Sequence, residues 1–231
     1  MIERLERARV VPILRLRDHG LSVEIARILV EAGLDVIEVT LDHPDALGSI
    51  RAIADELADD ALVGAGTVRH TEDVRRAGEA GARFCVSPHT DPALIAACAR
   101  LGLEALPGTL TPTDVARALD AGARILKLFP AAPLGTGYLR ALLGPFRGVA
   151  FVPTGGIAHD EAGAWLAAGA AAVGLGSDLV PAAPAHGDLA AIARRAAAIV
   201  RGAPLARVDD RARAARCRGS GRIGWRTGGG R

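Results

Sequence analysis

The chain has little lysine, few aromatic residues, little cysteine and no long apolar run. Aromatic side chains make up 3% of its 231 residues, so the core must consist of Ala, Val, Leu and Ile, which suits helices packed on a sheet. No apolar stretch approaches the roughly 20 residues that a membrane-spanning helix needs, which argues against a membrane partner. Cys85, Cys98 and Cys217 are odd in number and widely spaced, which disfavours a disulfide framework and predicts a reducing, cytoplasmic location.

The histidines also lack a pattern. None of the six has the spacing of a metal ligand, and neither a His-x-His nor a Cys-x-x-Cys pair occurs. We therefore predict that the protein holds no metal, which disfavours a zinc-dependent carbon–carbon lyase.

The C-terminal segment differs from the rest of the chain. Residues 203–231 hold eight arginines against Asp209 and Asp210, together with many glycines and little apolar periodicity. This composition predicts a disordered basic tail outside a globular domain of residues 1–202. A nucleic-acid-binding tail is the alternative, but a plain basic extension is favoured, so we expect no nucleic-acid partner.

Within residues 1–202, apolar runs alternate with segments of helical length. Most of these runs are continuously apolar, which is typical of parallel strands buried on both faces. The predicted strands cover 9–15, 34–40, 61–66, 83–87, 103–106, 124–129, 149–153 and 171–175.

A weak repeat accompanies this alternation. Ala-Gly ends a helix before a strand at Gly33, Gly81, Gly122 and Gly169, as expected of helix C-termini that need a left-handed residue. Eight such β/α units predict a single α/β domain with the (β/α)₈ TIM-barrel fold. A doubly wound open sheet is the alternative, although no Gly-x-Gly-x-x-Gly motif follows the first strand.

Lys127 is the single lysine among 28 basic residues, and it interrupts an apolar strand. Arginine keeps its proton at any workable pH, whereas a desolvated lysine loses it readily and becomes a nucleophile that forms an imine with a carbonyl. The alternative is a snorkelling lysine at a strand end. Because arginine snorkels equally well and was not used, the sequence favours a catalytic amine.

Glu38 interrupts another apolar strand, 34–40, where a carboxylate is costly unless it has a partner. One interpretation is a structural ion pair with a buried arginine. The other is a general acid/base whose pKa is raised by apolar surroundings and which moves protons near the Lys127 amine. Imine chemistry requires both groups.

Other polar residues also follow strands, where barrel enzymes place their active sites. Arg15 ends the first strand, and Thr67 either binds a carboxylate or caps a helix. After the seventh and eighth strands come Thr154-Gly155-Gly156 and Gly176-Ser177. Paired glycines there predict backbone amides that bind a phosphate, although tight turns also use glycine constantly.

Seven segments resemble, in order, those of class I 2-keto-3-deoxy-6-phosphogluconate aldolases, a family that also includes 4-hydroxy-2-oxoglutarate and 6-phosphogalactonate enzymes. The resemblance covers about residues 5–202. The segments are Val10-Val11-Pro12-Ile13-Leu14-Arg15, Ile37-Glu38-Val39-Thr40, Val63-Gly64-Ala65-Gly66-Thr67-Val68, Val86-Ser87-Pro88-His89, Leu126-Lys127-Leu128-Phe129-Pro130-Ala131, Phe151-Val152-Pro153-Thr154-Gly155-Gly156 and Gly174-Leu175-Gly176-Ser177.

The resemblance implies a homotrimeric (β/α)₈ barrel that needs no cofactor. Lys127 would match the Schiff-base lysine, Glu38 the general acid/base and Thr67 a contact of the pyruvyl carboxylate. The phosphate site would consist of Gly156, Gly176 and Ser177. The implied reaction cleaves a phosphorylated keto acid, 2-keto-3-deoxy-6-phosphogluconate, into pyruvate and glyceraldehyde 3-phosphate.

The chain departs from the family pattern at Asp42. Many phosphogluconate enzymes carry arginine four residues after the glutamate, and an aspartate cannot hold a carboxylate. We hypothesise that Arg15 supplies the missing cation. The loop at Pro44 resembles phosphogalactonate enzymes, whereas Thr40 and residues 152–154 resemble phosphogluconate ones, which are favoured.

Two further functions stay open on the same barrel. One is a phosphosugar isomerase or epimerase that uses Glu38 as a base and Lys127 as an electrostatic clamp. The other is a non-catalytic barrel that binds a phosphosugar.

Overall fold

The computed structural model describes residues 1–182, 184 and 188–202. The predicted disordered tail, residues 203–231, lies outside this range. The elements in chain order are α1 (Ile2–Ala8), β1 (Val10–Leu14), α2 (His19–Glu31), β2 (Val36–Thr40), α3 (Ala46–Glu56), β3 (Leu62–Gly66), α4 (Thr71–Glu79), β4 (Phe84–Val86), α5 (Pro92–Arg100), β5 (Glu104–Leu106), β6 (Gly108–Thr109), α6 (Pro112–Asp120), β7 (Ile125–Leu128), η1 (Ala132–Leu134), α7 (Gly135–Leu143), β8 (Ala150–Pro153), η2 (His159–Glu161), α8 (Ala162–Ala167), β9 (Val173–Leu175) and α9 (Leu189–Gly202).

Each predicted strand range contains a strand, so the parallel α/β prediction is confirmed. β6 was not predicted, because a run of two residues carries no periodicity and Pro107, which lacks an N–H, separates it from β5. The helix ends also agree with the Ala-Gly repeat. Gly33, Gly81, Gly122 and Gly169 have φ angles of 94°, 96°, 95° and 108°, in the left-handed region that glycine adopts without steric cost.

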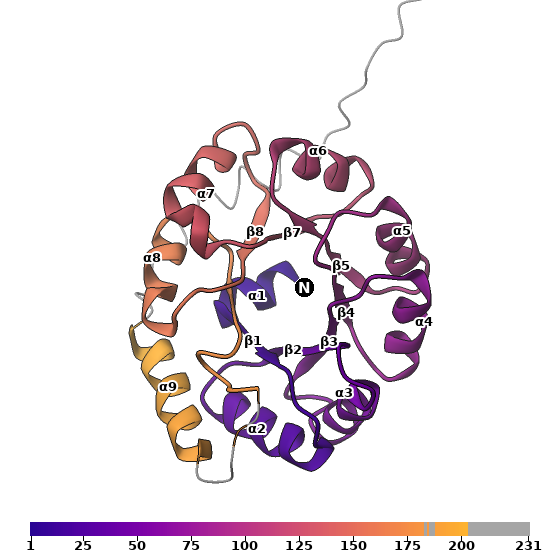
Figure 1. The fold of residues 1–231 in the computed structure, drawn as a ribbon, viewed down its shortest axis with the longest axis vertical. Coiled ribbons are helices and arrows are strands. Elements are labelled where there is room, and N and C mark those ends of the chain that lie inside the picture. The colour runs from indigo at the N-terminus through magenta and orange to yellow at the C-terminus, as the bar shows by residue number, and fades with distance from the viewer. Residues whose placement is uncertain (183, 185–187, 203–231) are drawn as a thin grey trace, which may run out of the picture.

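The strands form two parallel sheets. The first has the order β5-β4-β3-β2-β1-β9 and the second β6-β7-β8, and an isolated parallel bridge joins Thr154 to Gly174 between β8 and β9. In the view of Figure 1 the strands curl around α1, while α2 to α9 lie outside them. A doubly wound sheet carries its connecting helices on both faces, whereas Figure 1 shows α2 to α9 outside the curled strands, so that alternative is wrong.

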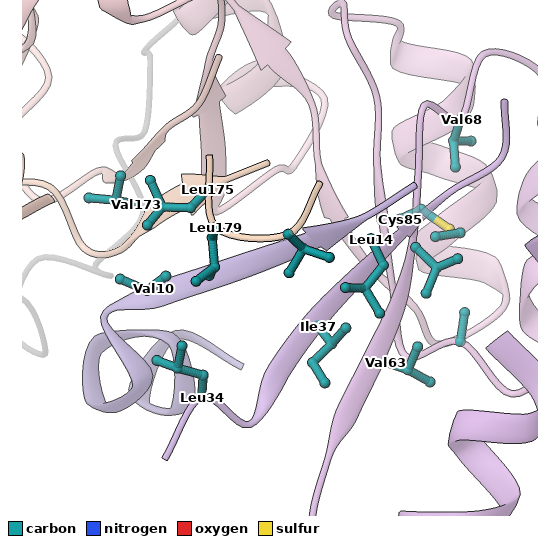
Figure 2. Close-up of a cluster of buried hydrophobic side chains, with 14 of the residues drawn as sticks. Val10, Leu14, Leu34, Ile37, Val63, Val68, Cys85, Val173, Leu175 and Leu179 are labelled. Carbon is teal, nitrogen blue, oxygen red and sulfur yellow. The ribbon is translucent and has the colours of Figure 1, made fainter. Parts of the chain in front are cut away.

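Side chains alternate between the two faces of each strand, and this alternation creates two cores. In β2, Ile37 and Val39 pack toward the helices in the larger cluster, part of which Figure 2 shows. Val36 belongs instead to a smaller cluster on the concave face, where it packs with Leu5 of α1. Glu38, two residues after Val36, therefore points to the concave face beyond this smaller cluster.

The same alternation places Lys127. Ile125 of β7 lies in the concave-face cluster, whereas Leu126 and Leu128 lie in the larger cluster toward the helices. Lys127 shares the face of Ile125 and lies nearer the carboxyl end of the strand.

None of the helices in the described part of the chain has both the length and the apolar character that a membrane crossing requires.

Candidate active site

A cavity of about 560 Å³ opens where the strands end. All nine site residues predicted from the sequence line it, although they come from six segments of the chain. They are Arg15, Glu38, Thr67, Lys127, Thr154, Gly155, Gly156, Gly176 and Ser177.

Lys127 is one of the residues that line this cavity. It is only 7% exposed, so the interpretation as a snorkelling lysine is wrong. Its Nζ atom lies 4.0 Å from Oε1 of Glu38 and 5.0 Å from the centre of the Phe129 ring, a distance at which the ring face attracts a cation. Strand pairing with Gly108 and Val152 on either side fixes the backbone of Lys127.

Glu38 is 3% exposed and faces Lys127 from β2. Burial raises the pKa of its carboxyl above the ordinary value of 4.5, and the nearby charge of Asp42 adds to this effect. The charges of Lys127 and Arg15 act in the opposite direction without cancelling the increase in pKa. The predicted rise in the pKa of Glu38 is therefore confirmed. The proposed pair with a buried arginine is wrong, because the buried cation beside Glu38 is Lys127.

Arg15 and Asp42 form an ion pair at the rim of the cavity. Nε of Arg15 lies 2.7 Å from Oδ2 of Asp42, and the hydroxyl of Thr40 donates to the other carboxylate oxygen at 2.7 Å. The Arg15 side chain is 59% exposed, which leaves its guanidinium within reach of a ligand that enters from solvent. Asp42 thus stands beside Arg15, at the place where the sequence departs from the aldolase pattern.

Thr67 adopts a backbone conformation that is rare for any residue except glycine. Its φ angle is 57°, directly after β3, and such strain is found mostly at functional sites. The helix that follows, α4, begins at Thr71 with His70 at its N-cap position, so the alternative role of Thr67 as a helix cap is wrong.

The glycine loops after β8 and β9 form one side of the cavity. Gly155 and Gly156 have φ angles of 97° and 77°, and a Cβ atom on Gly155 would lie 2.9 Å from the Phe129 ring. Gly176 faces open space, since a Cβ atom there would meet nothing within 4 Å. Thr154 is buried, and its hydroxyl donates to the carbonyl of Val152 at 3.2 Å.

Sequence reasoning missed two residues at this side. Asp178 lines the cavity directly after Ser177, and His159 contacts it from the η2 turn. The only sequence signal for Asp178 is its position next to a predicted strand end, whereas His159 lies five residues beyond Thr154 and carries no signal of its own. Among the described residues, no group of three or more His, Cys, Asp or Glu side chains is placed to hold a metal ion.

Comparison with known proteins identifies the family. A sequence model described as KDPG and KHG aldolase matches residues 1–195. The chain belongs to this aldolase family. It is 40% identical over 183 residues to a 2-dehydro-3-deoxy-phosphogluconate aldolase of Treponema pallidum (79% of this chain, 87% of the relative). It is 37% identical over 152 residues to a 2-dehydro-3-deoxy-6-phosphogalactonate aldolase of Escherichia coli (65% and 74%).

Solved structures of the family have the same fold as this aldolase. A KDPG aldolase from Legionella pneumophila, with pyruvate captured as a covalent carbinolamine, superposes with a TM-score of 0.77 at 29% identity and covers 86% of this chain and 97% of that one. In the aldolase described here, the cavity holds an amine 4.0 Å from a carboxyl whose pKa is raised. An amine so placed can form an imine, and such a carboxyl can both give and take protons.

Proposed function

We propose that this aldolase cleaves 2-dehydro-3-deoxy-6-phosphogluconate to pyruvate and glyceraldehyde 3-phosphate through an imine at Lys127. The observation that carries the proposal is the buried pair of Lys127 and Glu38, with 4.0 Å between Nζ and Oε1, inside a cavity lined by glycine loops. No cofactor takes part.

In the proposed mechanism, Nζ of Lys127 adds to the keto carbon C2, and water leaves to form the protonated imine. Glu38, acting through a water molecule, removes the proton of the C4 hydroxyl. The C3–C4 bond then breaks, and its electron pair moves toward the imine nitrogen to give an enamine. After the aldehyde departs, protonation at C3 with the help of Glu38 and hydrolysis of the imine release pyruvate.

The same proposal assigns the two ends of the substrate. Arg15 and Thr67 hold the carboxylate that becomes part of pyruvate. The backbone amides of the glycine loops and the Ser177 hydroxyl bind the phosphate, with Thr154 and Gly155 lining the space between. The phosphate residues are Gly156, Gly176 and Ser177. Amides that point into a cavity bind anions without a full positive charge.

A second candidate substrate is 2-dehydro-3-deoxy-6-phosphogalactonate. The observation that favours it is the loop at Pro44, which resembles that of phosphogalactonate enzymes, together with the 37% identity to the Escherichia coli relative. 4-Hydroxy-2-oxoglutarate is a further expected substrate, since the family includes enzymes that act on it.

We also propose that residues 1–202 form a closed (β/α)₈ barrel, with β5 and β6 as one strand bent at Pro107. The bridge between Thr154 and Gly174 supports closure on the other side.

The family resemblance supports a homotrimer, which light scattering on the purified protein would test. Cys85 and Cys98 are buried free thiols, which supports a cytoplasmic location.

Borohydride reduction in the presence of pyruvate tests the central claim. We expect the lysine peptide to gain the mass of a reduced pyruvate adduct, and the Lys127→Arg variant to show neither the adduct nor cleavage. An isomerase or epimerase would turn over a phosphosugar without an adduct, and a phosphosugar-binding barrel would bind without turnover.

The rates of cleavage of the gluconate and galactonate phosphates, measured side by side, decide which of the two is the substrate.

A further inference from the structure

Two contacts between His159 and Asp178 join the loops after β8 and β9. The backbone N–H of His159 donates to Oδ2 of Asp178 at 2.6 Å, and Nδ1 of the ring lies 2.5 Å from the same oxygen. We call this pair the His159–Asp178 clasp. Asp178 lines the cavity, and neither Asp178 nor His159 was predicted from the sequence as a site residue.

The position of the clasp is informative. The isolated bridge between Thr154 and Gly174 ties the two chain segments together at the strand ends. Further along both segments, the clasp joins them a second time. Gly155, Gly156, Gly176 and Ser177 all lie between these two ties, so the pair of ties fixes the relative position of the two loops.

A carboxylate at this place is otherwise unexpected. Asp178 lines the cavity beside the loops proposed to bind phosphate, where its negative charge opposes an anionic ligand. Partial burial alone would raise the pKa of Asp178, but the backbone and ring of His159 and the charge of Arg195 together lower it, so the carboxyl stays ionised. The other charged groups on the η2 turn are Asp160 and Glu161, and Glu161 accepts from the N–H of Ala158. An unfavourable charge next to a phosphate site needs a compensating role.

We propose that His159 and Asp178 are positioning residues that hold the two glycine loops as one phosphate-binding surface. This inference rests on the proposed function, because it needs a phosphate at these loops. The clasp contributes hydrogen-bond geometry rather than charge. Asp178 accepts both contacts through Oδ2, and the amide oxygen of an asparagine can accept both in the same way. Alanine at position 178 can accept neither.

The experiment compares two acceptor aldehydes in the synthetic direction, D-glyceraldehyde 3-phosphate and unphosphorylated D-glyceraldehyde, each added to saturating pyruvate. The readout is the ratio of the two kcat/KM values within each variant. This ratio does not depend on how much of the variant is folded, because both rates scale with the same active fraction. We expect Asp178→Ala, which removes both contacts, to lower the ratio about tenfold, which corresponds to about 1.4 kcal/mol. His159→Ala keeps the backbone contact and should lower the ratio by a smaller factor. Asp178→Asn should keep the ratio at or above the wild-type value.

A matched control is Asp91→Asn. Asp91 also accepts a backbone N–H with its carboxylate, at 2.8 Å from Ala93, in the loop after β4, and it is not among the residues that line the cavity. Its ratio should equal that of the wild type. If Asp178→Ala raises the ratio as much as Asp178→Asn does, charge alone matters and the clasp is refuted. A wild-type enzyme that forms the pyruvate adduct yet shows no preference for the phosphorylated aldehyde would instead refute the phosphate site itself.

Discussion

Glu38 is a buried carboxyl, and its titration has a direct consequence for stability. Burial raises the pKa of its carboxyl above 4.5, so between pH 4.5 and this raised pKa the folded state binds more protons than the unfolded state. The contribution of Glu38 to stability is therefore complete below pH 4.5 and is lost as the pH rises through the raised pKa.

Glu38→Gln removes this titration while keeping the shape of the side chain. We expect the Tm of the wild type, relative to the variant, to fall as the pH increases from 4 to 8. Thermal unfolding of both proteins over this range measures the difference. A difference in Tm that stays constant with pH would show that Glu38 titrates alike in the folded and unfolded chains.

Arg15 is expected to bind the carboxylate of pyruvate, because Asp42 stands where many phosphogluconate enzymes resembling this chain carry an arginine. Arg15→Ala should raise the KM for pyruvate by at least about tenfold, since a charge-assisted hydrogen bond contributes about 1.5–3 kcal/mol. Kinetics in the synthetic direction with varied pyruvate give this value. Arg17→Ala is the matched control, because Arg17 follows the same strand and is exposed but does not line the cavity. An unchanged KM for Arg15→Ala would remove the assignment.

Among single residues, the sequence reveals those whose charge is unfavourable in an apolar segment. Lys127 and Glu38 were found because each is a charged residue inside an apolar strand. The Arg15–Asp42 pair and the His159–Asp178 clasp were not found, because their partners lie 27 and 19 residues apart in polar loops, where a charge is unremarkable. Such contacts depend on how loops from different strands meet, and local sequence carries no information about that.

Among the elements, the β2–β3 pair controls the position of Glu38. Gly66 pairs with Thr40 at the end of β3, and a Cβ atom on Gly66 would lie 2.0 Å from Oε1 of Glu38. Gly66→Ala must therefore displace the carboxylate from its present position 4.0 Å from Nζ of Lys127. We expect kcat to fall about 100-fold, the cost of a displacement of about 1 Å in a catalytic group. Steady-state cleavage assays measure the loss, and near-normal kcat would show that Glu38 has freedom to move without cost.

Helix α7 offers the opposite case, a glycine that the fold does not require. Gly137 is exposed within Gly135–Leu143, and a Cβ atom there would meet nothing within 4 Å. Gly137→Ala should stabilise the protein by about 0.5–1 kcal/mol, because alanine loses less backbone entropy in a helix. This corresponds to an increase in Tm of about 1–4 °C for a domain of this size. Catalytic constants should not change, which also makes this variant the control for Gly66→Ala.

The elements themselves were largely predictable. Continuous apolar runs marked strands such as Val36–Thr40 and Ile125–Leu128, and left-handed glycines marked the helix ends. The missed strand, Gly108–Thr109, shows where such reasoning fails. It exists because the Thr109 hydroxyl donates to the Lys127 carbonyl and its backbone pairs with β7, contacts that arise only after β7 is in place.

The whole molecule divides its concave face between stability and chemistry. Residues early in the strands, among them Val11, Val36 and Ile125, form an apolar cluster with Leu5 and Ala8 of α1. Residues from the middle of the strands onward, and in the loops beyond them, line the cavity instead. One set of strands thus carries an apolar cluster toward its amino ends and charged groups toward its carboxyl ends.

Leu5→Ala tests this division. Leu5 is fully buried at the centre of the cluster, so its truncation should cost about 2–5 kcal/mol of unfolding free energy. Leu101→Ala is the matched control, because Leu101 is 51% exposed and its truncation should change stability by less than about 0.5 kcal/mol. Denaturant unfolding measures both. At denaturant concentrations below its unfolding midpoint, Leu5→Ala should retain the wild-type kcat, counted per lysine that borohydride traps. The reason is that Leu5 lies at the end of the strands away from Lys127. A proportional loss of kcat would mean that the apolar cluster and the cavity behave as one unit.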